Sequence, residues 1–101
     1  MKPVLIHPQA KAELDAAVAY YESHLPGLGM DFLAQVEEAI QKIRRNPQTW
    51  PRHHDARFRR YLLERFPYSL VYMERPDASW IVAVAHAKRR PNYWKRRLPP
   101  K

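Results

Sequence analysis

The chain has 101 residues, a length that suits one domain and is too short for two. It contains no cysteine, which excludes a disulfide framework and any metal site built on thiolates. The first residues lack the apolar core of a signal peptide, and no apolar stretch is long enough to span a membrane. We therefore expect one domain over residues 1–101, located in the cytoplasm and without a membrane partner.

The positive charge is concentrated in the second half of the sequence. The formal net charge of the chain is +8, but residues 1–50 carry −1 and residues 51–101 carry +9. Such an asymmetry is typical of a scaffold half joined to a half that meets an anionic partner, such as nucleic acid, the ribosome or an acidic protein. A basic solvated surface with no such partner is the alternative.

The first half of the chain predicts a short strand followed by two helices. Val4 to Ile6 form an apolar run too brief for a helix, and Pro8 suits the first turn of the helix that follows. Apolar residues then recur at helical spacing on either side of a break at residues 26–29, which predicts an antiparallel helical hairpin. The stripes are Leu14, Ala17, Val18, Tyr21 and Leu25, and, in a helix over about residues 30–45, Phe32, Leu33, Val36, Ala39, Ile40 and Ile43.

The second half predicts three strands and a basic tail. Strand-like segments cover residues 58–65, 68–74 and 80–86, and the turn residues between them favour an antiparallel meander. Residues 80–85 are apolar at every position, which is typical of a central strand, and the first strand is expected beside it. The predicted fold class is therefore α+β in the order β-α-α-β-β-β. A helical hairpin packs on a small, largely antiparallel sheet, and a short basic C-terminal tail follows.

Several motifs resemble, in their order along the chain, those of one protein superfamily. Tyr20-Tyr21-Glu22 and Pro26-Gly27-Leu28-Gly29 are similar to the helical hairpin of plasmid-stabilisation toxins. Residues 65–72 resemble the third strand of these toxins, and residues 82–94 resemble their last strand and basic tail. The chain thus resembles the RelE/ParE superfamily over nearly its whole length. The resemblance implies the toxin of a type II toxin-antitoxin module, which inhibits growth, and a cognate acidic antitoxin encoded beside it.

The superfamily contains more than one kind of toxin, so the resemblance leaves the target open. One branch poisons DNA gyrase, and another cleaves messenger RNA on the ribosome as an endoribonuclease. Members of the cleaving branch carry an arginine after the tyrosine of the third strand, where this chain has Ser69. This departure favours gyrase poisoning. Ribosome-dependent RNA cleavage is the first alternative, and a basic nucleic-acid-binding domain without toxicity is the second; none of the three implies a cofactor.

If the chain is a ribonuclease, His86 is the residue best placed to move a proton. RNA cleavage needs proton transfer and cations that stabilise negative charge at the phosphorus centre. His86 ends an apolar strand just before a basic cluster, whose charges favour the neutral imidazole that can act as a base. Arg65, Arg89 and Arg90 would hold the phosphate, and Tyr93 would stack on a base. A structural role for this single histidine is the alternative.

Cations and aromatic side chains of the second half form the expected surface for the target or the antitoxin. Such mixtures suit nucleic acid or a helical partner, although edge-strand charges and a tail packed onto the sheet are alternative explanations. We expect an acidic amphipathic segment of the antitoxin to cover this surface. No metal is expected, because His53 and His54 are adjacent and the side chains of adjacent residues rarely bind the same ion. The surface residues are Arg57, Arg59, Arg60, Arg65, Lys88, Arg89, Arg90, Tyr93, Trp94, Arg96 and Arg97.

Overall fold

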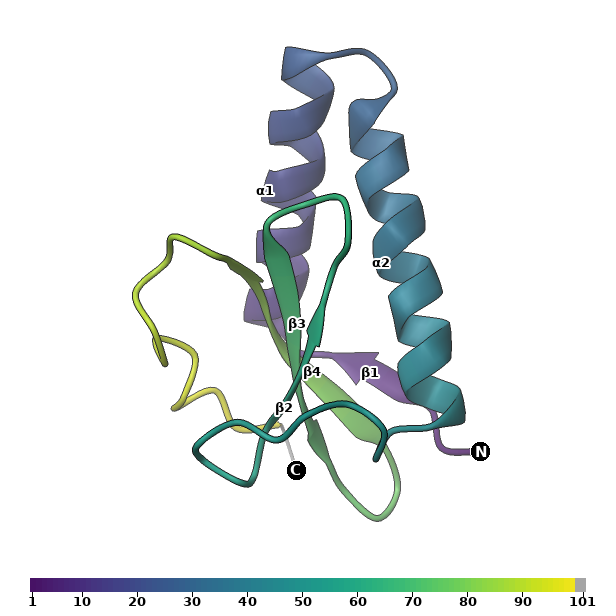
Figure 1. Cartoon of the computed structure of the whole chain (residues 1–101), viewed down its shortest axis with the longest axis vertical. Coiled ribbons are helices and arrows are strands. Elements are labelled where there is room, and N and C mark those ends of the chain that lie inside the picture. Colours follow the sequence, from purple (N-terminus) through teal and green to yellow (C-terminus); the bar gives the residue numbers. More distant parts are fainter. Residues whose placement is uncertain (100–101) are drawn as a thin grey trace.

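Helices and strands follow one another in the predicted order β-α-α-β-β-β (Figure 1). The computed structural model describes residues 1–99. The predicted α+β class and the placement of the helical hairpin before the meander are therefore confirmed. The elements are β1 Val4–Ile6, α1 Pro8–His24, α2 Leu28–Arg45, β2 Arg59–Leu62, β3 Tyr68–Glu74 and β4 Ser79–His86.

β4 lies inside the sheet, whose strand order is β1-β4-β3-β2. β1 pairs with β4 in parallel, whereas β3 pairs in antiparallel fashion with both β4 and β2. This inner position agrees with the prediction from residues 80–85, because a strand buried on both faces is apolar at successive positions. β1 pairs only with Ser79 to Ile81, so among residues 1–99 no strand accompanies the second half of β4 on that side.

The helical hairpin covers one face of the sheet. Glu22 of α1 accepts hydrogen bonds from the backbone N–H groups of Gly27 and Gly29 at 2.8 and 3.0 Å, which satisfies two free donors at the start of α2. Gly29 also allows a close approach of the helices, because a Cβ there would lie 2.5 Å from the carbonyl oxygen of Val18. Within residues 1–99, neither helix combines the length and apolar character needed to cross a membrane. The predicted stripes supply the buried residues Leu14, Ala17, Phe32, Val36, Ala39 and Ile43.

Two details of the elements differ from the prediction. Leu25, expected in the apolar stripe of α1, lies in the hairpin turn with 57% of its surface exposed. The stripe ends one turn earlier because α1 stops at His24 and the chain reverses. The strand expected over residues 58–65 is shorter and covers only β2, because the chain already turns back after Leu62, where the Leu63 N–H donates to the carbonyl of Tyr68.

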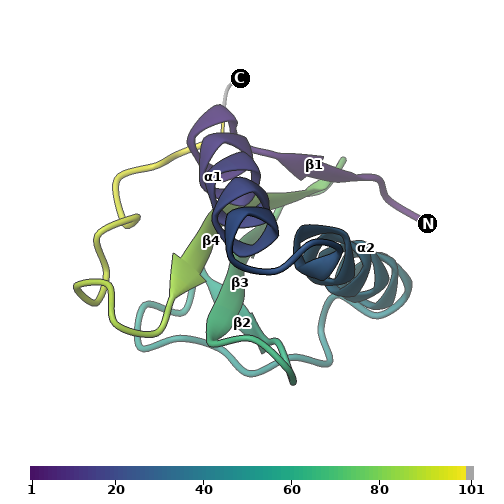
Figure 2. The same ribbon diagram turned by 90° about the horizontal axis from the view of Figure 1, so that it is seen from above.

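The face of the sheet opposite the helices is covered by the tail, residues 87–99, and by the part of the preceding loop from His53 to Phe58 (Figure 2). The anchor of the tail is Trp94, which is 4% exposed and packs its ring 4.8 Å from the ring of Phe58. The tail therefore folds onto the sheet, which was one of the two possibilities left open by the sequence. The second apolar cluster contains Phe58, Val71, Met73, Val82, Ala83 and Trp94.

Candidate partner-binding site

Glu13 of α1 organises the basic tail. Its carboxylate accepts hydrogen bonds from the backbone N–H of Val84 at 3.0 Å, from the Tyr93 hydroxyl at 2.7 Å and from the Arg97 guanidinium at 2.8 Å. Arg89 adds an ion pair at 3.6 Å. Arg97 also donates to the carbonyl of Val82 at 3.1 Å. The Glu13 side chain thus covers the edge of β4 where β1 does not pair with it, and it holds the tail against that edge.

Tyr93 lies between two cations of the tail. The guanidinium carbon of Arg89 is 3.9 Å from the centre of the Tyr93 ring, and that of Arg97 is 4.9 Å from it, both within the range of cation–π attraction. Burial raises the pKa of the Tyr93 hydroxyl, and the hydrogen bond to Glu13 raises it further. The hydroxyl therefore remains protonated and serves as the donor to Glu13.

An open-face cavity of about 210 Å³ lies between the sheet and the tail, on the side away from the helices. Two imidazoles and several cations line it: His53, Arg60, His86, Arg89 and Arg90. Its lining also includes Tyr93 and Trp94. The structure thus brings together four of the five residues expected for RNA cleavage, namely His86, Arg89, Arg90 and Tyr93.

The histidine of this cavity is already engaged with the backbone. His86 Nδ1 accepts the backbone N–H of Lys88 at 3.0 Å, which in the neutral ring leaves the proton on Nε2. The ring also meets Tyr68 edge to face, with 5.0 Å between the centroids. His86 is therefore hydrogen-bonded within the turn that starts the tail.

Arg65 and Arg57 do not join this cavity. Arg65 belongs to the turn between β2 and β3, where its guanidinium lies 3.8 Å from the carboxylate of Asp31 in α2. Arg57 pairs with Asp55 of the same loop at 2.6 Å. Hydrogen bonds from the Arg57 side chain and backbone lower the pKa of Asp55 to about 2. Both arginines point into solvent and remain accessible to a partner.

Other expected surface residues are used inside the molecule. Arg59 is largely buried, lies 3.5 Å from Glu74 and donates to the carbonyl of Trp50 at 2.8 Å. Trp94 belongs to the core, and Arg97 is only 13% exposed at its pair with Glu13. The members of the expected surface that are exposed are Arg57, Arg60, Arg65, Lys88, Arg89, Arg90 and Arg96.

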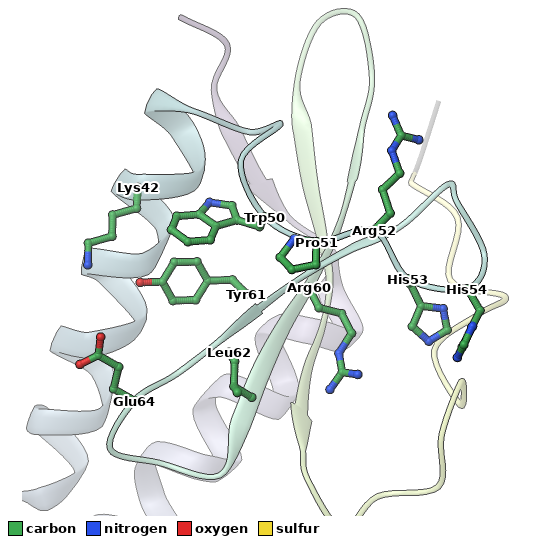
Figure 3. Close-up of a pocket in the computed structure, with 10 residues that line it drawn as sticks. All are labelled: Lys42, Trp50, Pro51, Arg52, His53, His54, Arg60, Tyr61, Leu62 and Glu64. Atoms are coloured by element: carbon green, nitrogen blue, oxygen red, sulfur yellow. The ribbon is translucent and has the colours of Figure 1, made fainter.

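A second and larger cavity, the β2-edge groove, follows the outer edge of the sheet and has a volume of about 650 Å³ (Figure 3). On the helix side of β2, the Tyr61 ring meets Trp50 edge to face, with 4.5 Å between the centroids, and points toward Lys42. On the other side lie His53 and Arg60, whose guanidinium donates to Ser69 Oγ at 3.2 Å. The groove is lined by Lys42, Trp50, Pro51, Arg52, His53, His54, Arg60, Tyr61, Leu62 and Glu64.

Comparison with known proteins identifies the family. The family model of the ParE toxin of the type II toxin-antitoxin system, parDE, matches residues 4–91. The chain belongs to the ParE toxin family. The fold of this toxin is similar to a solved structure described as the chromosomal ParDE TA system from P. aeruginosa, with a TM-score of 0.78 and 20% sequence identity over 87% of this chain and 98% of that chain. A search of curated proteins found no match.

Family membership confirms the type II toxin predicted from the motifs, and with it a cognate antitoxin as partner.

Two features of this ParE-family toxin were missed at the level of sequence. Glu13 follows Ala10 by three positions and precedes Ala17 by four, which places it beside the buried stripe of α1, and that spacing was the available signal. The β2-edge groove had no signal, because its lining comes from three separate segments. Within residues 1–99, no three His, Cys, Asp or Glu side chains gather in a way that could hold a metal ion.

Proposed function

We propose that this ParE-family toxin stops growth in the cytoplasm by poisoning DNA gyrase, as one domain that acts by binding and without cleaving RNA. The observation that carries the proposal is the environment of Ser69. The cleaving branch has an arginine at this position, whereas here the Ser69 side chain is buried and its Oγ accepts a hydrogen bond from Arg60 at 3.2 Å. Residue 69 itself therefore presents no cation to a phosphate, and the cation beside it belongs to Arg60.

The remaining candidates for catalysis support the same proposal. The Tyr93 hydroxyl donates to Glu13, and the Nδ1 lone pair of His86 is taken by a backbone N–H. A general base needs a free lone pair within reach of the proton that it removes. Arg65 lies apart at its pair with Asp31, so the five residues do not form one constellation.

The acidic antitoxin is proposed to cover the exposed cations of the tail and of the loop before β2. Arg57, Arg60, Lys88 and Arg90 are exposed in this region. An acidic partner would associate rapidly with such a surface, and salt would slow the association. Arg96 and Arg89 extend the same charge along the tail.

Purified toxin tests the gyrase proposal. We expect micromolar toxin to inhibit supercoiling of relaxed plasmid and to accumulate cleaved DNA in a reaction with gyrase and ATP. The matched control is topoisomerase I on the same plasmid, which the toxin should not affect. Unchanged supercoiling and no cleaved DNA at that concentration would contradict the proposal.

Ribosome-dependent cleavage of messenger RNA is the second candidate, favoured by the open-face cavity. That cavity gathers His53, His86, Arg60, Arg89 and Arg90 near a protonated tyrosine, a set that could hold a phosphodiester. Mapping transcript ends after induction distinguishes the candidates. Cuts within translated codons would support the nuclease, and arrest with intact transcripts and broken DNA would support gyrase poisoning. Growth arrest, whether with cut transcripts or with broken DNA, would also exclude a nucleic-acid-binding domain without toxicity.

A further inference from the structure

The open-face cavity has an excess of positive charge. Its lining includes two histidines and three arginines, whereas no Asp or Glu of residues 1–99 lines it. Glu13 and Asp55 contact lining residues, but both also have partners elsewhere. Glu13 accepts a hydrogen bond from Arg97 at 2.8 Å, and Asp55 accepts one from Arg57 at 2.6 Å. Such a surplus of cations favours an anionic ligand.

Both histidines of the cavity have an occupied Nδ1 atom. His53 Nδ1 accepts the backbone N–H of Asp55 at 3.2 Å, and His86 Nδ1 accepts that of Lys88 at 3.0 Å. In a neutral imidazole the other nitrogen then carries the proton, so each ring keeps an Nε2–H donor. Donors of this kind suit the oxygen atoms of an anion, whereas a metal ion needs a free lone pair.

Two of the three arginines are held in place by the protein. Arg60 donates to Ser69 Oγ at 3.2 Å, and the Arg89 guanidinium lies 3.6 Å from the carboxylate of Glu13. Arg90 is exposed and forms no ion pair with an acid of residues 1–99. Groups that are already ordered lose less entropy on binding, and a guanidinium can donate two parallel hydrogen bonds to one phosphate.

The volume of the cavity, about 210 Å³, suits one phosphate group. Sites for whole small molecules measure about 300 to 1,000 Å³, so a complete nucleotide is a poorer match. The walls include Val71, Ala85 and the ring of Trp94, which is 4% exposed. Apolar walls lower the local dielectric constant and strengthen the attraction between the cations and a bound anion.

The aromatic residues of the cavity favour duplex DNA over single-stranded RNA as the source of this phosphate. Unpaired bases are bound by stacking on open aromatic rings. Trp94 is buried, and the half-buried Tyr93 ring already meets the guanidinium carbons of Arg89 and Arg97 at 3.9 and 4.9 Å. Neither ring offers an open platform for a base. A duplex keeps its bases paired and presents its phosphates on the outside.

We propose that the open-face cavity binds one backbone phosphate of duplex DNA, so that the toxin contacts the DNA in the gyrase complex as well as the enzyme. This contact rests on the proposed function, in which gyrase and its DNA are the target. The three arginines supply the positive charge, and His53 and His86 supply N–H donors. Phosphates carry no sequence information, so the contact is independent of the base sequence.

NMR of the unmodified toxin tests the site. Toxin labelled with ¹⁵N is titrated with a short DNA duplex while the imidazole nitrogens are recorded. We expect the Nε2 resonances of His53 and His86 to shift together and to saturate, whereas those of the exposed His24 at the end of α1 stay unchanged. Duplex that binds without moving either imidazole of the cavity would overturn the proposal.

Single-stranded RNA of equal length and inorganic phosphate are the comparison ligands. We expect duplex DNA to produce the imidazole shifts at a lower phosphate concentration than either, because a duplex has the highest charge density of the three. RNA that acts at a lower concentration would overturn the choice of duplex DNA and favour the messenger RNA candidate. Inorganic phosphate that acts at a lower concentration would overturn it in favour of a free anion.

A matched pair of substitutions tests the contribution of one cation. Arg90→Gln removes a cavity cation that has no acidic partner within residues 1–99, and Arg44→Gln removes an exposed cation from the last turn of α2. Arg90→Gln should weaken duplex binding several-fold and make the plot of log binding constant against log salt shallower by about 1, the loss expected for one phosphate contact. Equal affinities and slopes for the two variants would count against the phosphate site.

Gyrase assays distinguish failure of this proposal from failure of the gyrase proposal. We expect Arg90→Gln to need several-fold more toxin than Arg44→Gln for the same DNA cleavage by gyrase. Toxin that leaves gyrase unaffected but shows shifted His53 and His86 resonances with duplex would contradict only the gyrase proposal. Gyrase poisoning together with unmoved imidazoles would contradict only the phosphate site.

Discussion

The Glu13 carboxylate in the first helix accepts a 2.7 Å hydrogen bond from the hydroxyl of Tyr93, a residue 80 positions later in the chain. The same carboxylate pairs with Arg97, whose side chain is 13% exposed. Removing one partner of a buried ion pair leaves the other charge without compensation. The order of the basic tail thus depends on one acid in the acidic half of the sequence.

We predict that Glu13→Gln destabilises the toxin by about 3 kcal/mol, because Arg97 would remain buried without a carboxylate. Urea unfolding followed by tryptophan fluorescence measures the effect, since Trp94 sits in the tail that Glu13 holds. Asp15→Asn is the matched control, as it breaks only the exposed pair with Lys11. Equal stability of the two variants would show that Glu13 does not hold the tail.

Stability should decrease as the pH falls below the ordinary range of histidine. Burial lowers the pKa of His53 from its usual 6.5, and the nearby His54 and Arg60 lower it further. The unfolded chain therefore takes up the proton first, and below pH 6.5 this uptake favours unfolding. The loss should level off once the pH is below the pKa of His53 in the folded state. We expect less denaturant to unfold the toxin at pH 5.5 than at pH 7.5.

His53→Gln should reduce this dependence on pH, whereas substitution of the exposed His24 at the end of α1 should not. The comparison uses the difference in unfolding midpoint between the two pH values for each variant. If the His53 variant retains the full difference, groups other than His53 cause it.

Gly29→Ala should destabilise the toxin by about 1 to 3 kcal/mol through overpacking. The added Cβ would lie 2.5 Å from the backbone oxygen of Val18, which cannot move aside as a flexible side chain would. Met30→Ala is the control, because Met30 is the next residue of the same helix and is 55% exposed. A thermal midpoint of the Gly29 variant equal to that of the control would contradict the close packing of the helices.

Arg60→Ala should slow association with the antitoxin several-fold and weaken its dependence on salt. Arg60 is exposed and lines both cavities, so it lies where the acidic partner is expected. Arg44→Ala removes another exposed cation, from the last turn of α2, and serves as the control. The rates are measured by surface capture of antitoxin at low and at physiological salt. Identical rates for both variants would place the antitoxin elsewhere.

The sequence predicted the elements because each depends on residues that are close along the chain. The apolar run at residues 80–85 identified the inner strand, and the helical stripes identified the hairpin, since burial imposes these periods locally. The site was predicted less well. Arg59 and Trp94 were expected at the surface, but each is held by partners far along the chain, Glu74 and Phe58. Periodicity within one element cannot reveal which distant side chain will meet it.

Charge counts along the sequence showed that the second half is basic. They did not show which of its cations pair with acids inside the molecule. Arg89 and Arg90 follow one another, yet the first pairs with Glu13, whereas the second forms no ion pair with an acid of residues 1–99. The difference arises from the way the tail packs, with Trp94 buried on the sheet and Arg97 paired with Glu13. The sequence is therefore enough to predict the sign of the charge on a partner-binding surface. The three-dimensional structure is needed to tell which cations of that surface are free to bind.

β1 and β4 are the first and the last strands along the chain, and they lie side by side in the sheet, where Val4 pairs with Ser79. During synthesis from the N-terminus, β1 has no partner strand until the chain has been made past Ser79. Contacts between such distant segments form late, because closing a long loop costs entropy before the contact compensates for it. The toxin therefore completes its sheet only after β4 has been made, so a nascent chain that ends before β4 has neither the full sheet nor the tail that packs on it.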